Sequence, residues 1–311
     1  MHLMIPHASA VGEAASHTLG ELTLPHLAEL LALLTPVGAP IGSDEYSFNT
    51  PFELALAQLR GAPAVEDGCL PTAAWGRAKD AAGPEAWAQL SPIHLSVGSD
   101  QITALPPQAL ALTEAESQAF FNSLAELWPA DEGWAAQWRG SDQWLIAHPS
   151  FAGLRSASLE RVVQRNVDPW MPQARRLRTL QNEVQMLLHG HPLNEAREAA
   201  GALSLNSVWI SGCGVASGGP LPADLQIEEG LREPLLAGDW QAWSEAWVRL
   251  DAGPVAALLA RAKQGETGLR LTLCGERLAR SWSLKPRPRL QRLWQSLRSS
   301  RSNTASILGA L

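Results

Sequence analysis

Residues 172–219 read PQARRLRTLQNEVQMLLHGHPLNEAREAAGALSLNSVWISGCGVASGG, and the interpretation of the whole chain starts from them. Apolar residues recur through residues 172–189 at spacings of three and four, which predicts a helix with one buried face. Gly190 ends that helix, and a short second helix follows it. Residues 206–210 then predict a buried strand that leads into a glycine-rich loop over residues 211–219.

The polar residues of this stretch form the candidate site. An Arg guanidinium pairs well with a carboxylate or phosphate, Asn amides orient polar groups, and the free backbone amides of a glycine loop accept an oxyanion. These groups together predict a site for a small phosphorylated or carboxylated metabolite. Its expected ligand-binding residues are His189, His191, Asn194, Arg197, Asn206, Gly212 and Gly214.

The same residues allow other interpretations. Asn194 and Arg197 would also serve to lock the turn onto the strand, with Asn206 satisfying buried backbone groups. Cys213 lies between two glycines and is a candidate nucleophile with a nearby His as base, although a small Cys in this position is more often a packing residue. A lone His-x-His pair is a weak signal for a metal site.

Spacing within this stretch also carries a family resemblance. The pattern is His191-Pro192-x-Asn194-x-x-Arg197, followed by Asn206-x-x-Trp209-x-x-Gly212-x-Gly214. It resembles a bacterial family of regulatory proteins of the RpfE type, which is described as cofactor-independent phosphoglycerate mutase. It is similar, more distantly, to the archaeal-type mutases of the alkaline phosphatase superfamily. Residues 92–95 and 271–276 extend the resemblance over the whole chain.

The resemblance implies a site with two metal ions, a Ser or Thr nucleophile, and Asp and His ligands, one Asp ending the first strand. This chain departs from that pattern, since its first strand ends in Pro6-His7 and every His lies at or before His191. The late strand ends in Cys-Gly-Glu-Arg where Gly-Asp-His is expected. An Arg brings positive charge to the metals where a ligand would donate a lone pair.

We therefore expect a regulatory relative that binds an anionic metabolite without a cofactor, so that enzyme activity is uncertain. The alternative is an active 2,3-bisphosphoglycerate-independent phosphoglycerate mutase, an isomerase that would need a divalent metal such as Mn or Zn.

The resemblance and the order of elements together predict an α/β fold. Its mostly parallel central sheet would be flanked by helices, in a pared-down version of the alkaline phosphatase superfamily. Residues 3–5 are the expected central strand, and His7 would lie at its carboxyl end, where α/β sheets usually bind ligands. Residues 269–273 alternate Leu inward with Arg and Thr outward. We expect a single domain over residues 1–311, or two lobes of about 1–150 and 151–311.

Shorter signals place the remaining elements. Helices are expected at 23–34, 50–60, 113–128, 155–167, 239–250, 254–263 and 286–298. Strands are expected at 93–97 and 101–105, joined by residues 98–100 as a hairpin, and in a pair within 134–147. Thr113 and Glu116 predict a capping box at the start of the helix 113–128. Tryptophans at 240, 243 and 247 predict a buried stripe on the helix 239–250. Residues 36–43 are expected to be a Gly/Pro-rich loop, 73–90 short helices, and the last ten residues a frayed tail.

Composition limits the class of protein. Hydrophobic residues make up 46% of the chain and charged residues 18%, which is typical of a globular protein. No apolar run reaches the roughly 18 residues of a membrane span, and the first residues lack the basic flank of a signal peptide. Three widely spaced cysteines form no disulfide or metal pattern. We expect a cytoplasmic protein with no membrane partner.

The charge distribution suggests a further alternative. The net charge is −7, yet no acidic residue follows Glu276 and eight basic residues do. A basic helix over residues 286–298 could contact nucleic acid or an acidic protein partner, which would make the chain an interaction protein. The same helix could instead dock its Leu and Trp side chains onto the acidic remainder of the chain.

Overall fold

The strand β1 (His2–Ile5) forms at the expected residues and is an interior strand of a five-stranded sheet, next to its edge strand. The computed structural model describes residues 1–76, 86–284 and 304–311. The strand order in this first sheet is β2-β11-β10-β1-β9. Parallel neighbours flank β1 on both sides, namely β10 (Arg270–Cys274) and β9 (Leu225–Ile227).

The expectation of a mostly parallel sheet is wrong. Strand β11 (Leu278–Ser283) follows β10 after a three-residue turn, so it must run antiparallel to it, and it pairs antiparallel with β2 (Thr35–Gly42) as well. Residues 36–43 were expected to be a loop because of their Gly and Pro content. They form the strand at the end of the sheet, where Pro is tolerated because one side needs no hydrogen-bond donor.

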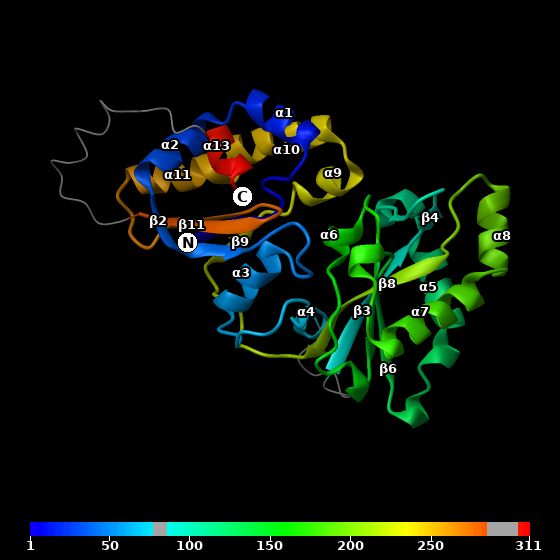
Figure 1. Cartoon of the computed structure of the whole chain (residues 1–311). Helices are drawn as coiled ribbons and strands as arrows, with labels where there is room; N and C mark the ends of the chain where they lie inside the picture. Colours follow the sequence, from blue (N-terminus) through cyan, green and yellow to red (C-terminus); the bar gives the residue numbers. More distant parts are fainter. Residues whose placement is uncertain (77–85, 285–303) are drawn as a thin grey trace. The chain divides into compact units, whose positions relative to one another are not determined.

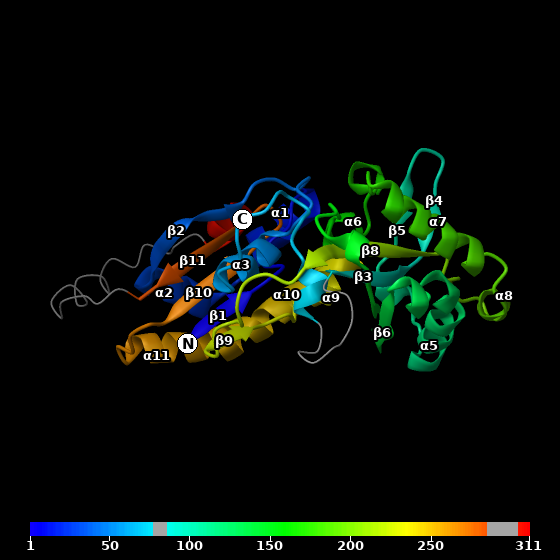
Figure 2. The same ribbon diagram turned by 90° about the horizontal axis from the view of Figure 1, so that it is seen from below.

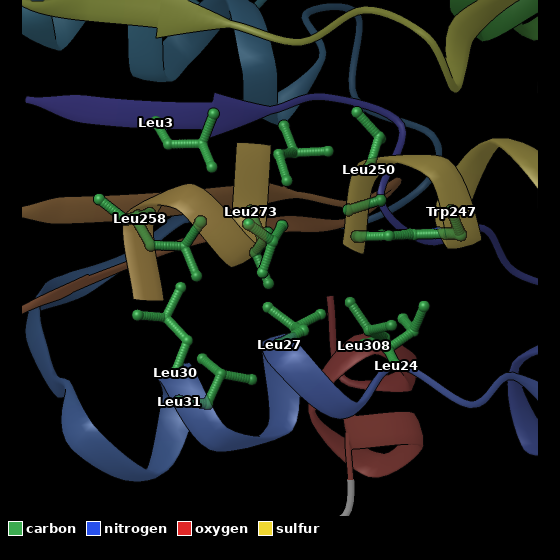
Figure 3. Close-up of a cluster of buried hydrophobic side chains, with 14 of the residues drawn as sticks. Leu3, Leu24, Leu27, Leu30, Leu31, Trp247, Leu250, Leu258, Leu273 and Leu308 are labelled. Atoms are coloured by element: carbon green, nitrogen blue, oxygen red, sulfur yellow. The ribbon is translucent and has the colours of Figure 1, made fainter. Parts of the chain in front are cut away.

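One face of the first sheet is apolar and carries most of the helices. Leu3, Leu271 and Leu273 point to this face because side chains alternate along a strand. Figures 1 and 3 show the helices that cover it, with Leu27, Trp247 and other side chains filling the space between. The covering helices are α1 (Glu13–Glu21), α2 (Pro25–Leu33), α9 (Arg232–Ala237), α10 (Trp240–Leu250), α11 (Ala256–Lys263) and α13 (Thr304–Gly309).

The last residues are ordered against this core and do not form the expected frayed tail. Leu308 and Leu311 are both buried in it. The backbone N–H groups of Arg277 and Leu278 donate to the carbonyl of Leu311, which ties the chain end to the turn between β10 and β11. Gly275 makes this approach possible, since a Cβ there would lie 2.5 Å from the Cβ of Leu311.

The opposite face of the first sheet is polar and is covered by α3 (Pro51–Leu59). Figure 2, seen from below, shows α3 over this face. His2, Arg270 and Thr272 point to it because they alternate with the Leu residues of β1 and β10. The two faces of one sheet therefore have different roles, one forming the core and the other lining a pocket.

A second, four-stranded antiparallel sheet has the order β6-β7-β3-β8. Its strands are β3 (Ala86–Ile93), β6 (Ala135–Gly140), β7 (Gln143–Ala147) and β8 (Ser207–Val215). Short helices were expected through residues 73–90. Among the described residues of this stretch, α4 (Thr72–Trp75) is helical, whereas Trp87 and Leu90 lie in β3, buried on both faces between two neighbouring strands.

Helices cover both faces of the second sheet. The helix α5 (Glu114–Ser123) and the long helix α7 (Arg175–Leu188) bury Phe120, Leu177 and Val184 against one face. The helix α4 packs on the other face with Trp87. The capping box expected from Thr113 and Glu116 is present at the start of α5 and confirms that prediction. The expected hairpin is also formed, by β4 (Leu95–Val97) and β5 (Ile102–Ala104).

The remaining elements are short. They are the helices α6 (Leu159–Val162) and α8 (Pro192–Ala199), the π-helical segment η6 (Asp251–Val255), and the 3-10 helices η1 (Pro107–Leu110), η2 (Ala125–Leu127), η3 (Ala130–Glu132), η4 (Pro149–Phe151) and η5 (Asp168–Trp170).

Two compact units contain the two sheets, with boundaries that interleave in the sequence. Unit 1 comprises residues 1–45, 54–60 and 220–311, and unit 2 comprises residues 46–53 and 61–219. A division near residue 150 would have cut the second sheet between β7 and β8. The chain instead leaves unit 1, builds unit 2, and returns to complete the first sheet with β9, β10 and β11.

A polar network holds residues 46–53 within unit 2. The carboxylate of Asp67 accepts the backbone N–H groups of Phe48 and Asn49. The amide oxygen of Asn49 accepts the N–H of Gly68 at 2.8 Å, and the hydroxyl of Ser158 donates to Glu53. These bonds attach this short segment to elements far along the chain.

Within the described ranges, no helix has both the length and the apolar character needed to cross a bilayer. The expected basic helix over residues 286–298 lies outside the described residues.

We predict that Asp251 is the main cap of α2. Its buried carboxylate accepts the N–H of Leu27 at 2.7 Å and the N–H and ring nitrogen of His26. Asp251→Ala should lower the free energy of unfolding by roughly 2 kcal/mol, measured in urea, because buried amides lose their acceptor. Asp239→Ala, at the exposed start of α10, is the control and should cost about 1 kcal/mol. Equal losses would contradict the assignment.

Candidate functional site

The predicted polar cluster lies in unit 2, where its amides and guanidinium hold the backbone together. The side chain of Asn194 is buried, and its Nδ2 donates to the carbonyls of Leu188 and Leu205 while its Oδ1 accepts the N–H of Leu205 at 2.8 Å. Asn206 bonds both backbone groups of Leu95, accepting its N–H and donating to its carbonyl. Each Asn thus supplies hydrogen bonds to backbone groups that have left regular pairing.

Arg197 is buried and bonded through three of its nitrogens. Its Nη1 donates to Glu116 Oε1 at 2.7 Å, its Nε donates to the carbonyl of Leu203 at 2.9 Å, and its Nη2 donates to the carbonyl of Leu110. Hydrogen bonds from the backbone amide of Thr113 and from Arg197 hold the pKa of Glu116 below its usual value. Arg197 therefore joins α8 to the start of α5. This is a structural role, the second of the two interpretations that the sequence allowed for Arg197.

The two histidines of the cluster do not converge on a shared point. His189 is exposed at the end of α7. His191 begins α8, where its Nδ1 accepts the N–H of Leu193 at 3.2 Å and its ring lies 4.9 Å from that of Phe120. Burial lowers the pKa of His191, which favours the neutral ring that this cap requires.

The expectation of an anion-binding loop over residues 211–219 is wrong for its first half. Residues up to Val215 belong to β8, and Gly214 pairs with Trp87. Gly212 has φ 64°, and a Cβ there would lie 2.6 Å from the backbone nitrogen of Ala73 and against the hydroxyl of Thr72. The glycines are needed because α4 packs directly on this strand.

The buried cysteines are poorly suited to nucleophilic chemistry. Burial raises the pKa of Cys213 to about 12, and burial also raises the pKa of Cys274. Both thiols are therefore protonated near neutral pH, whereas the thiolate is the nucleophile. Cys213 packs in the core of unit 2, as a small apolar residue would.

The carboxyl ends of β1 and β10 lie where the resemblance places metal ions. His7 follows β1 with φ 58°, and its carbonyl accepts the ring N–H of Trp243 at 3.2 Å. The carboxylate of Glu276 accepts the N–H of Val11 at 2.8 Å, so it holds the loop after β1. Across the described residues, no three His, Cys, Asp or Glu side chains come together to hold a metal ion. These residues do not fit the implied two-metal site.

A pocket in unit 1 brings together a different set of polar side chains. It lies towards the amino-terminal ends of β1 and β10, away from their carboxyl ends. We call it the α3 pocket. It has a volume of about 270 Å³ between the polar face of the first sheet and α3. Its lining residues are His2, Met4, Val37, Gly38, Ala39, Ile41, Ala55, Gln58, Leu59, Arg270, Thr272 and Ser281. None of the seven residues expected to bind a ligand is among them.

A chain of hydrogen bonds crosses the floor of the α3 pocket over three adjacent strands. His2 Nε2 lies 2.7 Å from Thr272 Oγ1, and Thr272 Oγ1 lies 2.7 Å from Ser281 Oγ. Burial, and then the positive charge of Arg270, lowers the pKa of His2 to about 4. His2 is therefore neutral near pH 7, and Arg270 is the cationic side chain among the described lining residues.

Sequence reasoning missed this pocket, although one signal for it was present. The alternation in residues 269–273 sends Arg270 and Thr272 away from the core, and His2 and Met4 alternate with Leu3 in the same way. What the alternation does not show is that α3 covers this outward face. The pocket depends on that long-range contact.

Comparisons with known proteins give only distant similarities. No known family matches the chain, and no curated protein is similar to it in sequence. Its structure is similar to "Cofactor-Independent Phosphoglycerate Mutase from Thermoplasma acidophilum DSM 1728", at 12% identity over 100% of this chain and 99% of the other, with a TM-score of 0.35. It is also similar to the PH0037 protein from Pyrococcus horikoshii, at 11% identity over 93% of this chain and 88% of the other, with a TM-score of 0.49.

Both TM-scores lie below 0.5, so these similarities establish neither the family nor the activity of the chain.

We predict that Arg197 stabilises the fold of unit 2. Arg197→Gln should lower the free energy of unfolding by roughly 2–4 kcal/mol, because Glu116 and two buried carbonyls lose their donors. Urea denaturation measures this loss. Arg178→Gln is the matched control on the exposed side of α7 and should cost under about 0.5 kcal/mol. Two equally stable variants would show that Arg197 has no structural role.

We also predict a pH dependence that originates at His2. The folded-state pKa of about 4 lies below the ordinary 6.5, so between these values the unfolded chain binds a proton that the folded chain does not. The contribution of His2 to stability is complete above pH 6.5 and is lost as the pH falls towards 4. His2→Gln should flatten the dependence of stability on pH in this window, and exposed His17→Gln should not. An unchanged slope in His2→Gln would refute the assignment.

Proposed function

We propose that this protein binds a small anionic metabolite, phosphorylated or carboxylated, in the α3 pocket. In this proposal it is a regulatory, phosphoglycerate-mutase-like protein of the RpfE type that does not break phosphoester bonds. The observation that carries the proposal is Arg270 at a pocket whose floor is lined by His2, Thr272 and Ser281.

Charge and hydrogen bonding support an anion as the ligand. The Arg270 side chain is exposed, and no carboxylate in the described part of the chain pairs with it. A guanidinium offers a planar set of N–H donors that fits a carboxylate or a phosphate. No Asp or Glu is among the described lining residues, so none of these side chains repels a bound anion.

The size of the pocket supports a small ligand. Its volume of about 270 Å³ is slightly below the roughly 300 Å³ at the lower end of typical ligand sites. A metabolite of a few carbon atoms with one acidic group is the size that such a pocket can enclose.

The loss of phosphoryl-transfer chemistry is proposed from the donor set. At the carboxyl end of β1, Glu276 holds the loop backbone and His7 stands where the resemblance implies an Asp ligand. Of the residues outside the described ranges, 285–303 contain no His, Cys, Asp or Glu, and 77–85 contain Asp80 and Glu85.

We predict that anion binding depends on Arg270. Calorimetry and thermal shift with 3-phosphoglycerate, succinate and hexanoate should show at least one anion that binds the wild-type protein. Arg270→Gln should weaken that binding about tenfold or more, because a charge-assisted hydrogen bond is lost. Arg280→Gln removes an exposed Arg from the neighbouring strand β11 and should leave binding unchanged. Binding by none of the three anions, or equal binding by Arg270→Gln, would contradict the proposal.

A further inference from the structure

Among its described lining residues, the α3 pocket carries a single positive charge. Arg270 supplies it, since the ring of His2 is neutral near pH 7. The other charged groups near His2 are the N-terminal ammonium of Met1 and Asp224, which pair with each other at 3.2 Å. A phosphate monoester carries close to two negative charges at pH 7. Its second charge would find no second cationic partner among the described lining residues. A monoanion matches the pocket better.

The hydrogen bonds on the floor supply a second donor for that anion. When His2 Nε2 carries the ring proton it donates to Thr272, which leaves the Thr272 hydroxyl to donate to Ser281. The hydroxyl hydrogen of Ser281 is then available to a ligand. The two aligned hydrogen bonds behind it make this hydroxyl a stronger donor. Arg270 and Ser281 lie on the same face of the sheet. Together they can serve the two oxygens of one carboxylate.

Four apolar side chains stand around the floor of the pocket, and Gln58 on α3 is the polar side chain among the other described lining residues. Leu59 and Ala55 on α3 form one wall, and Val37 and Ile41 on β2 form another, with Val37 paired to Ser281 across the sheet. Leu59, Ala55, Val37 and Ile41 offer a ligand hydroxyl no hydrogen-bond partner, whereas a methylene group buried against them gains affinity. The walls therefore favour a hydrocarbon chain over a polyhydroxylated one.

Resting on the function proposed above, we infer that the ligand of the α3 pocket is a monocarboxylate with a short apolar chain. Its carboxylate binds Arg270 and Ser281, and its chain lies against Leu59, Val37 and Ile41. This assigns the site to a short-chain fatty acid or a similar keto acid, and sets it apart from sites for sugar phosphates and phosphoglycerates.

The test compares four probes on the full chain by isothermal titration calorimetry. Hexanoate has the anion and the chain, glycerate has the anion alone, 1-hexanol has the chain alone, and 3-phosphoglycerate has additional charge. Hexanoate should bind at least tenfold more tightly than each of the others. Arg270→Gln and Ser281→Ala should each weaken hexanoate binding about tenfold or more. Val37→Thr, which keeps the side-chain shape, should weaken hexanoate binding about fivefold and leave glycerate binding unchanged.

The outcomes separate the two proposals. Tighter Arg270-dependent binding of glycerate or 3-phosphoglycerate would overturn the inference and leave the proposed function intact. Hexanoate binding that Arg270→Gln does not alter would also overturn the inference, since the chain alone would then account for it. Failure of every anion to bind would overturn both. Thermal unfolding of each variant verifies that a loss of binding is not a loss of folding.

Discussion

The two-residue periodicity of β1 and β10 is the constraint on which unit 1 depends. Because adjacent side chains on a strand point to opposite faces, the Leu residues of both strands meet the helices on one side while His2, Arg270 and Thr272 meet α3 on the other. A shift of one residue in the pairing would bury Arg270 in the core and expose the Leu side chains. The apolar core therefore fixes the position of the polar groups as firmly as it fixes its own packing.

Unit 2 shows how a structural network can resemble a binding site. Buried backbone groups at the turn between α7, α8 and β8 need hydrogen-bond partners, and Asn and Arg side chains supply them. The residue types that recognise an anion are the same ones that satisfy a buried carbonyl or amide. Similar sequence spacing brings such residues together in a binding site and in a structural network. Only the positions of their hydrogen-bond partners distinguish the site from the network. The structural role of Arg197 is evident from its bonds to Glu116 and Leu110. Both partners are more than 80 residues away in the chain.

Local signals in the sequence predicted most of the elements and few of the long-range relations. The capping box at Thr113, the Trp stripe of α10 and the hairpin of β4 and β5 follow from residues within one turn or one hairpin of each other. The β3 strand was missed because Trp87 and Leu90 are buried on both faces, so no alternation marks them. Strand direction, the cover that α3 provides and the return of the chain to unit 1 depend on contacts between distant segments. The candidate site could not be located without those contacts.

The ring of His2 reports most directly whether an anion binds at the polar face of the first sheet. The nitrogen-15 signals of the histidine rings can be followed during titration with hexanoate and with 3-phosphoglycerate, with His2 assigned by His2→Gln. The account predicts that the His2 signals shift saturably with at least one of these anions. It also predicts that they do not shift in Arg270→Gln, and that the signals of His189 and His191 stay unchanged. Saturable binding that leaves His2 unperturbed, or that perturbs His191 instead, would contradict it.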